Sequence, residues 1–243
     1  MSFNTWMPAA LASEARPWTG SVWRMVEAQH TASTMKIVDT NDEQNLLESL
    51  LEGSKPAQPD ATQDLDYLLA TPFRYYPARP GSRFRAVTDP GVFYGAESVR
   101  TASAELGYWR WKFLKDAVDL DKLQPVAHTA FSAEVKTQVI DLRLPPFSEQ
   151  ASSWSHPSDY TATQALAQVA RTAQVGAIQY ASVRDPQPAW CLALLTPQGF
   201  AKPKPNPLMQ TWWLAVHQDA VTWRRDNASM TFFSTDWSGP ELV

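Results

Sequence analysis

The hydrophobic pattern of the first third of the chain predicts one strand and two helices. Residues 21–27 are typical of a strand, and residues 42–52 place leucines at helical spacing ahead of Gly53, which favours a helix end. Residues 54–59 contain two prolines and predict a turn or linker. Leucines within residues 65–69 then indicate a second, short helix.

The middle of the chain carries clearer signals. Residues 83–88 favour a strand, residues 89–91 (Asp-Pro-Gly) favour a turn, and residues 92–94 begin the next strand. Ser98 is a good N-cap for a helix that runs to about Val118. The apolar face expected for this helix consists of Val99, Ala102, Leu106, Trp109 and Phe113.

The last part of the chain is rich in short strand patterns. Residues 136–142 suggest a strand, residues 144–160 a long surface loop, and residues 161–175 a helix with Gly176 as its C-cap. Residues 202–207 alternate with prolines and predict a loop. Because strands outnumber helices without regular alternation, the sequence predicts a mixed α+β fold. The remaining predicted strands are 177–183, 190–195, 210–216, 220–224 and 230–234.

Composition narrows the class of protein. The chain has 243 residues, 44% of them hydrophobic and 19% charged, which is ordinary for a soluble globular protein of one large or two small domains. The formal net charge of −4 offers no basic surface for nucleic acid or an acidic membrane. No stretch approaches the roughly 20 apolar residues that span a bilayer. Since the N-terminus also lacks a signal-peptide pattern, we expect a cytoplasmic location.

Several common catalytic signatures are absent from the sequence. It contains neither a phosphate-binding glycine-rich loop nor a Gly-x-Ser-x-Gly nucleophile elbow. Cys191 is the single cysteine and lies in an apolar run, which favours a buried structural thiol and allows no internal disulfide. The histidines are scattered without metal-ligand spacing, so no metal site is expected. They are His30, His128, His156 and His217.

Four positions form a more specific pattern. Arg83 lies in Gly81-Ser-Arg-Phe-Arg-Ala, Tyr94 follows in the next predicted strand, and Glu105 lies on the helix after it. Ser182 lies within the later Tyr-Ala-Ser-Val-Arg stretch at 180–184. The order and spacing resemble the RES domain, a family of bacterial toxins named for its arginine, glutamate and serine. The resemblance covers roughly residues 71–200.

The resemblance implies roles for these side chains in cleaving NAD⁺. The Glu105 carboxylate would stabilise positive charge on the ribose, and Arg83 would bind the pyrophosphate with two parallel hydrogen bonds. Tyr94 would stack on the nicotinamide ring, and Ser182 would orient Glu105 or bond to a ribose. Arg85 is the alternative to Arg83 as the functional arginine. The further candidates for phosphate contact are Arg74, Arg85 and Arg184.

The same resemblance implies a fold and a biological setting. RES proteins resemble ADP-ribosyltransferases, so we expect a strand-rich α+β fold with helices around a split β core. Residues 1–70 would be an N-terminal extension that packs on or flanks the core, and residues 71–243 would be the RES domain. Family membership implies a toxin that takes NAD⁺ as substrate, needs no cofactor, and is neutralised by an Xre-like helix-turn-helix antitoxin protein.

Three kinds of function stay open at this point. The chain could be an NAD⁺ glycohydrolase or phosphorylase, which differ in using water or inorganic phosphate as the acceptor. The same site could serve a protein ADP-ribosyltransferase. The domain could also be an interaction module without activity. Self-association into a homo-oligomer is open as well.

Overall fold

A computed structural model describes residues 6–28, 38–77 and 81–237. Its eight strands form one mixed sheet in the order β1-β2-β5-β4-β3-β6-β7-β8. The predicted α+β class is confirmed. The strands are β1 (Arg16–Glu27), β2 (Phe93–Ala96), β3 (Lys122–Asp141), β4 (Ala177–Ala181), β5 (Trp190–Leu194), β6 (Gln210–His217), β7 (Ala220–Arg225) and β8 (Ala228–Phe233). The helices are α1 (Pro8–Glu14), α2 (Asn41–Ser54), α3 (Tyr67–Arg74), α4 (Val99–Asp116), α5 (Ala151–Trp154) and α6 (Thr161–Thr172).

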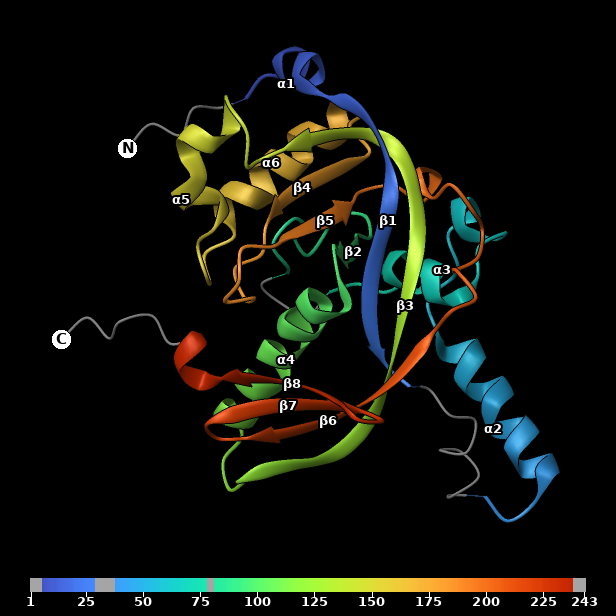
Figure 1. Ribbon diagram of the computed structural model, residues 1–243. Helices are drawn as coiled ribbons and strands as arrows, with labels where there is room; N and C mark the ends of the chain where they lie inside the picture. Colours follow the sequence, from blue (N-terminus) through green and yellow to red (C-terminus); the bar gives the residue numbers. More distant parts are fainter. Residues whose placement is uncertain (1–5, 29–37, 78–80, 238–243) are drawn as a thin grey trace.

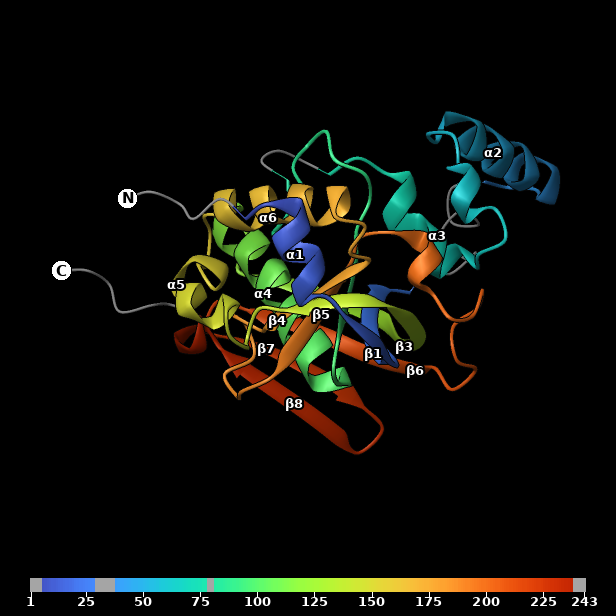
Figure 2. The same ribbon diagram turned by 90° about the horizontal axis from the view of Figure 1, so that it is seen from above.

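The long strand β3 joins two parts of the sheet. Its second half pairs with β1 over twelve residues and ends beside β4, and β1 also touches β2. Since β2 pairs with β5 and β5 with β4, these five strands close a ring. The first half of β3 carries the antiparallel β6-β7-β8 meander (Figure 1). Figure 2 shows α1 and α6 on one side of the strands and β8 at the opposite edge.

Helix α4 lies where the two parts of the sheet meet. It packs against β1, β6 and β7. Ser98 caps it as predicted, because the Thr101 backbone N–H donates to the Ser98 hydroxyl at 3.1 Å. The apolar face predicted for this helix is wrong in part: Trp109 and Phe113 are 49% and 56% exposed. Apart from Tyr108 and Leu114, the buried residues of this helix are small or polar, which allows it to approach the strands closely.

The other differences from prediction have local causes. Residues 83–88 are not a strand, because Ser82 and Arg85 bond to each other through their backbones and close a tight turn. The predicted loop 144–160 contains α5 and a short 3₁₀ helix. The strand predicted at 136–142 is the end of the much longer β3. Helix α6 ends at Thr172, before Gly176, and Gln174 takes the left-handed conformation with φ 56°.

The remaining predicted elements are confirmed to within a few residues, including all five strands after residue 176. His30 lies outside the described residues. The predicted boundary at residue 71 stays a prediction, although β1 from the first 70 residues is part of the central sheet. None of the described helices is long and apolar enough to cross a membrane.

Gly91 offers a test of the packing between α3 and the start of β2. A Cβ at Gly91 would overlap the backbone of Pro72 and Phe73 in α3. We expect Gly91→Ala to lower the free energy of unfolding by about 1–3 kcal/mol, because backbone cannot move aside as a flexible side chain can. Denaturant unfolding measures this. Gly53→Ala is the control, since nothing lies within 4 Å of a Cβ added at that position. Equal denaturation midpoints for the two variants would contradict the close packing at Gly91.

Candidate active site

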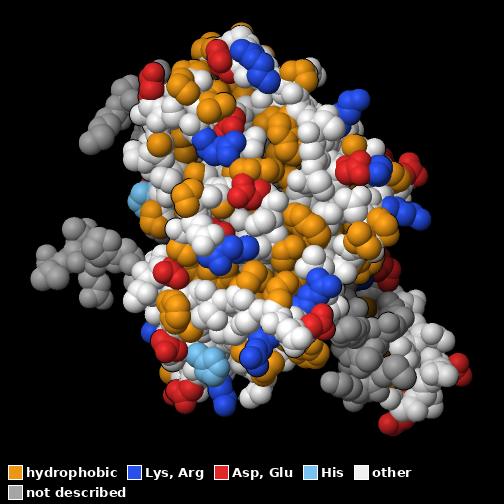
Figure 3. Space-filling model, in the orientation of Figure 1, with side chains coloured by type: hydrophobic (Ala, Val, Ile, Leu, Met, Phe, Trp, Pro, Cys, Tyr) orange, Lys and Arg blue, Asp and Glu red, His pale blue; other side chains and the backbone are white. Residues whose placement is uncertain are grey.

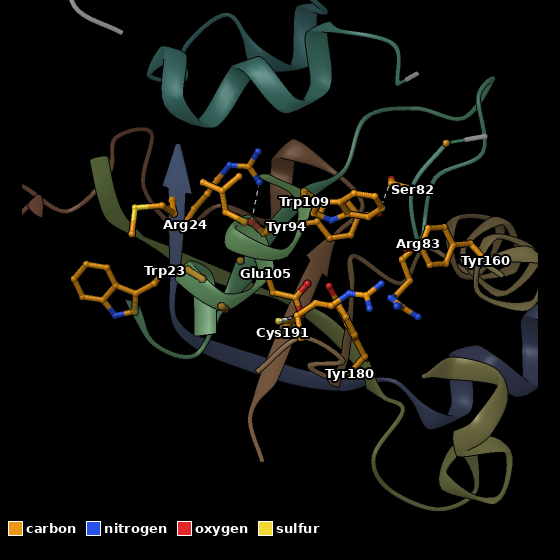
Figure 4. A pocket seen from close by; sticks show the side chains of 17 residues that line it. Trp23, Arg24, Ser82, Arg83, Tyr94, Glu105, Trp109, Tyr160, Tyr180 and Cys191 are labelled. Carbon is orange, nitrogen blue, oxygen red and sulfur yellow. Dashed lines mark hydrogen bonds between the residues drawn. The ribbon is translucent and has the colours of Figure 1, made fainter. Parts of the chain in front are cut away.

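A pocket of about 380 Å³ opens between β1, β2, β5 and helix α4 (Figure 4). Strand β4 and the segment after it, the turn before Phe84 and the start of α6 contribute the remaining walls. Its polar lining combines one carboxylate with three arginines, and most of the rest is aromatic or small. The lining side chains used below are those of Arg24, Arg83, Tyr94, Glu105, Trp109, Tyr160, Tyr180, Arg184 and Cys191.

Glu105 supplies the carboxylate from the second turn of α4. The Ser182 hydroxyl donates to its Oε1 at 2.6 Å, and the Cys191 thiol lies 3.7 Å from the same oxygen. Both contacts are made to Oε1. Among the described residues none donates a hydrogen bond to Oε2, so Oε2 is available to a ligand. The side chain is half-buried, which strengthens its interaction with any charge that enters the pocket.

Ser182 is oriented by the turn that follows β4. Its Oγ accepts hydrogen bonds from the backbone N–H groups of Arg184 (3.3 Å) and Asp185 (3.1 Å). Since those bonds occupy the oxygen lone pairs, the hydroxyl proton is directed at Glu105. The buried Asp185 carboxylate fastens this turn to the start of α4, where it pairs with Arg100 at 3.2 Å and accepts from the Thr101 hydroxyl at 3.1 Å.

Two arginines line the pocket on the side of α5 and α6. Arg83 donates from Nη1 to the Trp154 carbonyl (2.9 Å) and the His156 carbonyl (3.0 Å), and its guanidinium lies over the Tyr160 ring. Arg184 is 3% exposed. Its guanidinium lies 3.5 Å from the centre of the Tyr108 ring and donates to a carbonyl of the neighbouring loop. Both cations are therefore held in place before any ligand arrives.

A third arginine reaches the pocket from β1. Arg24 donates from Nη1 to the Tyr94 carbonyl at 2.8 Å, and its buried Nε has no hydrogen-bond partner among the described residues. Burial lowers the pKa of Arg24 to about 10, so it remains charged at neutral pH. With three cations against one carboxylate, the pocket favours an anionic ligand.

Tyr94 uses its hydroxyl to hold the turn that carries Arg83. The Phe84 backbone N–H donates to it at 2.9 Å, and it shares a 2.8 Å hydrogen bond with the Ser82 hydroxyl. Burial raises the pKa of Tyr94, which keeps the hydroxyl neutral. The ring lines the pocket while the hydroxyl faces the turn, as the dashed line to Ser82 in Figure 4 indicates.

Comparison with known families identifies the domain that contains this pocket. The family model of the RES domain matches residues 58–217, about two thirds of the chain. The chain belongs to the RES-domain family. All of the site residues predicted for this RES domain fall within the match: Arg74, Arg83, Arg85, Tyr94, Glu105, Ser182 and Arg184. Arg24 lies before it, on β1.

One solved structure similar to this RES protein is that of the M. tuberculosis MbcT–MbcA toxin–antitoxin complex. The two chains are 13% identical, the match covers 92% of this chain and 89% of that one, and the TM-score is 0.45. No curated protein matched the sequence. The family assignment therefore rests on the domain match.

The structure brings most of the predicted site residues together. Arg83, Tyr94, Glu105 and Arg184 line the pocket, and Ser182 reaches it through Glu105. Two candidates are placed elsewhere. Arg74 pairs with Glu52 on α2 at 2.7 Å, and the Arg85 side chain donates to the Asp89 carbonyl. The roles of all these residues stay a prediction.

Some pocket residues carried little signal in the sequence. Arg24 stands among apolar residues in a strand, which is an unusual place for a charge, but nothing local connects it to Glu105. Cys191 is buried as expected and also contacts Glu105. Among the described residues, no group of three or more His, Cys, Asp or Glu side chains could hold a metal ion.

The Cys191 thiol should be unreactive in the folded protein. Burial raises its pKa well above the ordinary value, and the charge of Glu105 adds to that effect. A free cysteine is about a quarter ionised at pH 8, whereas Cys191 stays protonated. We expect alkylation by iodoacetamide at pH 8 to be at least about 100-fold slower in the native protein than in denaturant. Comparable rates, followed by mass spectrometry, would show that the thiol is accessible and ionised.

Proposed function

We propose that this RES protein cleaves NAD⁺ at the N-glycosidic bond between nicotinamide and ribose. The observation that carries the proposal is a single carboxylate, fixed by a serine hydroxyl, in a pocket that otherwise holds three arginines. This combination suits a substrate that carries a pyrophosphate and develops positive charge on one sugar during the reaction.

The arginines match the anionic part of such a substrate. NAD⁺ carries two negative charges on its pyrophosphate, and guanidinium groups bind phosphate oxygens with charge-assisted hydrogen bonds. Arg83 is anchored by carbonyls at the end of α5 and in the loop after it, Arg184 by a carbonyl of the same loop, and Arg24 by the Tyr94 carbonyl. Because these groups are already ordered and partly dehydrated, binding would cost little reorganisation.

The carboxylate matches the reacting part. When the bond breaks, its electron pair goes to the ring nitrogen, nicotinamide leaves as a neutral molecule, and positive charge develops at C1′ of the ribose. The available Oε2 of Glu105 would stabilise that charge, and no general acid is needed. Water then adds to C1′ and releases a proton, or inorganic phosphate adds in its place. The rings of Tyr94, Tyr180 and Trp109 offer faces for the flat groups of the substrate.

The same proposal extends to a biological role as the toxin of a toxin–antitoxin pair, with NAD⁺ depletion in the cytoplasm as its effect. Family membership supports this role, and an Xre-like antitoxin protein is the partner it implies. Acidic and basic side chains are interspersed on the face seen in Figure 3, in keeping with the net charge of −4 and with a target other than nucleic acid.

Growth and the cellular NAD⁺ concentration, followed together after expression is induced, would test this role. Arrest at unchanged NAD⁺ would favour protein ADP-ribosylation, and absence of arrest an inactive module.

Glu105→Gln should remove activity without unfolding the protein. The change deletes the charge and keeps the shape, and losing one such electrostatic contact typically lowers the rate by about 10²–10³. NAD⁺ loss by purified protein measures it. Asp116→Asn is the matched control, because this exposed carboxylate ends the same helix outside the pocket. A Glu105→Gln variant that keeps half the wild-type rate would refute the role of this carboxylate.

Arg83→Lys should weaken NAD⁺ binding. Lysine keeps the charge but cannot form two parallel hydrogen bonds, and hydrogen bonds to charged groups contribute roughly 1.5–3 kcal/mol. We therefore expect KM to rise by about tenfold or more. Arg85→Lys is the comparison, since Arg85 is equally buried but lies outside the pocket. A rise in KM for Arg85→Lys alone would reverse the assignment of the two arginines.

A further inference from the structure

Trp237 lies twenty residues beyond the end of the RES match, in the short turn that follows β8. Its indole N–H donates to the backbone carbonyl of Arg184 at 2.8 Å. The acceptor belongs to the same turn that orients Ser182, and Arg184 itself lines the pocket. A residue outside the matched domain therefore touches the segment that holds the proposed catalytic carboxylate.

Aromatic packing fixes the position of this indole. The Trp237 ring lies 5.7 Å from Tyr108 in an edge-to-face arrangement, 5.6 Å from Trp111 and 6.2 Å from Phe232. Tyr108 in turn carries the Arg184 guanidinium on its face. Helix α4, the C-terminal turn and the Ser182–Asp185 segment thus meet in one cluster.

Two contacts connect the turn after β4 to the start of α4 and to the turn after β8, in addition to the anchoring of the Arg184 side chain described above. On one side the Asp185 carboxylate bonds to Arg100 and Thr101 at the start of α4. On the other side its Arg184 carbonyl accepts from Trp237. Between these points, the N–H groups of Arg184 and Asp185 direct the Ser182 hydroxyl at Glu105. Loss of either support would let the peptide unit rotate and weaken that alignment.

We propose that Trp237 is a positioning residue, which acts through the Arg184 carbonyl to keep the Ser182 hydroxyl on Glu105. The inference rests on the proposed NAD⁺ cleavage for its kinetic consequence, although the structural link can be tested without it. The turn after β8 would then contribute to the active site. The segment that the family match covers would lack β7, β8 and this indole, and its active site would be incomplete without them.

Trp237→Phe tests the inference, because it removes the donor and keeps an aromatic ring. We expect kcat to fall about three- to tenfold, the equivalent of one hydrogen bond, and KM to stay within about twofold. Trp212→Phe is the matched control: its indole N–H also makes one hydrogen bond, to the Gln210 side chain at 2.9 Å, but it lies outside the pocket lining and outside the aromatic cluster around Trp237. Equal losses of kcat in both variants, or a change confined to KM, would overturn the inference.

A double-mutant cycle with Ser182→Ala separates positioning from general loss of stability. If Trp237 acts through Ser182, Trp237→Phe should change kcat by less than about twofold once the hydroxyl is gone. Multiplicative effects of the two changes would mean that they act independently and would contradict the proposed route.

Hydrogen exchange provides a readout that needs no activity. The amides of Arg184 and Asp185 are bonded to Ser182, so Trp237→Phe should speed exchange in peptides that cover residues 182–189 by about threefold or more, while Trp212→Phe leaves them unchanged. Unchanged exchange in Trp237→Phe would overturn the inference whatever the enzyme does. Faster exchange in a wild-type protein that leaves NAD⁺ intact would uphold the structural link and reject only the proposed function.

Discussion

The hydrogen bond from the Ser182 hydroxyl to Glu105 Oε1 is the contact around which the pocket is organised. A half-buried carboxylate needs partners, and a serine whose oxygen already accepts two backbone N–H groups can only turn its proton outward. That single geometric requirement links strand β4, the start of α4 and the C-terminal turn. The start of α4 and the turn after β8 each contribute a hydrogen bond that keeps the Ser182 turn aligned with the helix.

Charge is the second constraint on this pocket. Three guanidinium groups surround a space that contains one carboxylate, and burial is severe enough to lower the pKa of Arg24 to about 10. Holding several cations together in a poorly solvated pocket is unfavourable, and an anionic ligand relieves that cost. The arrangement therefore supports binding of a pyrophosphate-containing substrate more directly than a purely structural role.

Much of the fold and of the site could be predicted where the determinants are local. Ser98 caps α4 and Glu105 faces inward from it, and the strands after residue 176 follow their turn signals. The order of Arg83, Tyr94, Glu105 and Ser182 also identified side chains that meet. What failed depends on distant contacts. Arg24 enters the pocket because β1 pairs with β3 more than a hundred residues later, and Trp109 is exposed because α4 buries small residues instead.

The identity of the products formed from NAD⁺ tests the central claim most directly. Purified protein would be incubated with NAD⁺, with and without inorganic phosphate, and followed by proton NMR. The account predicts that free nicotinamide appears in equal amount to the NAD⁺ lost, together with free ADP-ribose or its phosphorylated form. NAD⁺ that stays intact beside folded protein would contradict cleavage at this pocket, and nicotinamide release with ADP-ribose bound to protein would contradict a small-molecule acceptor.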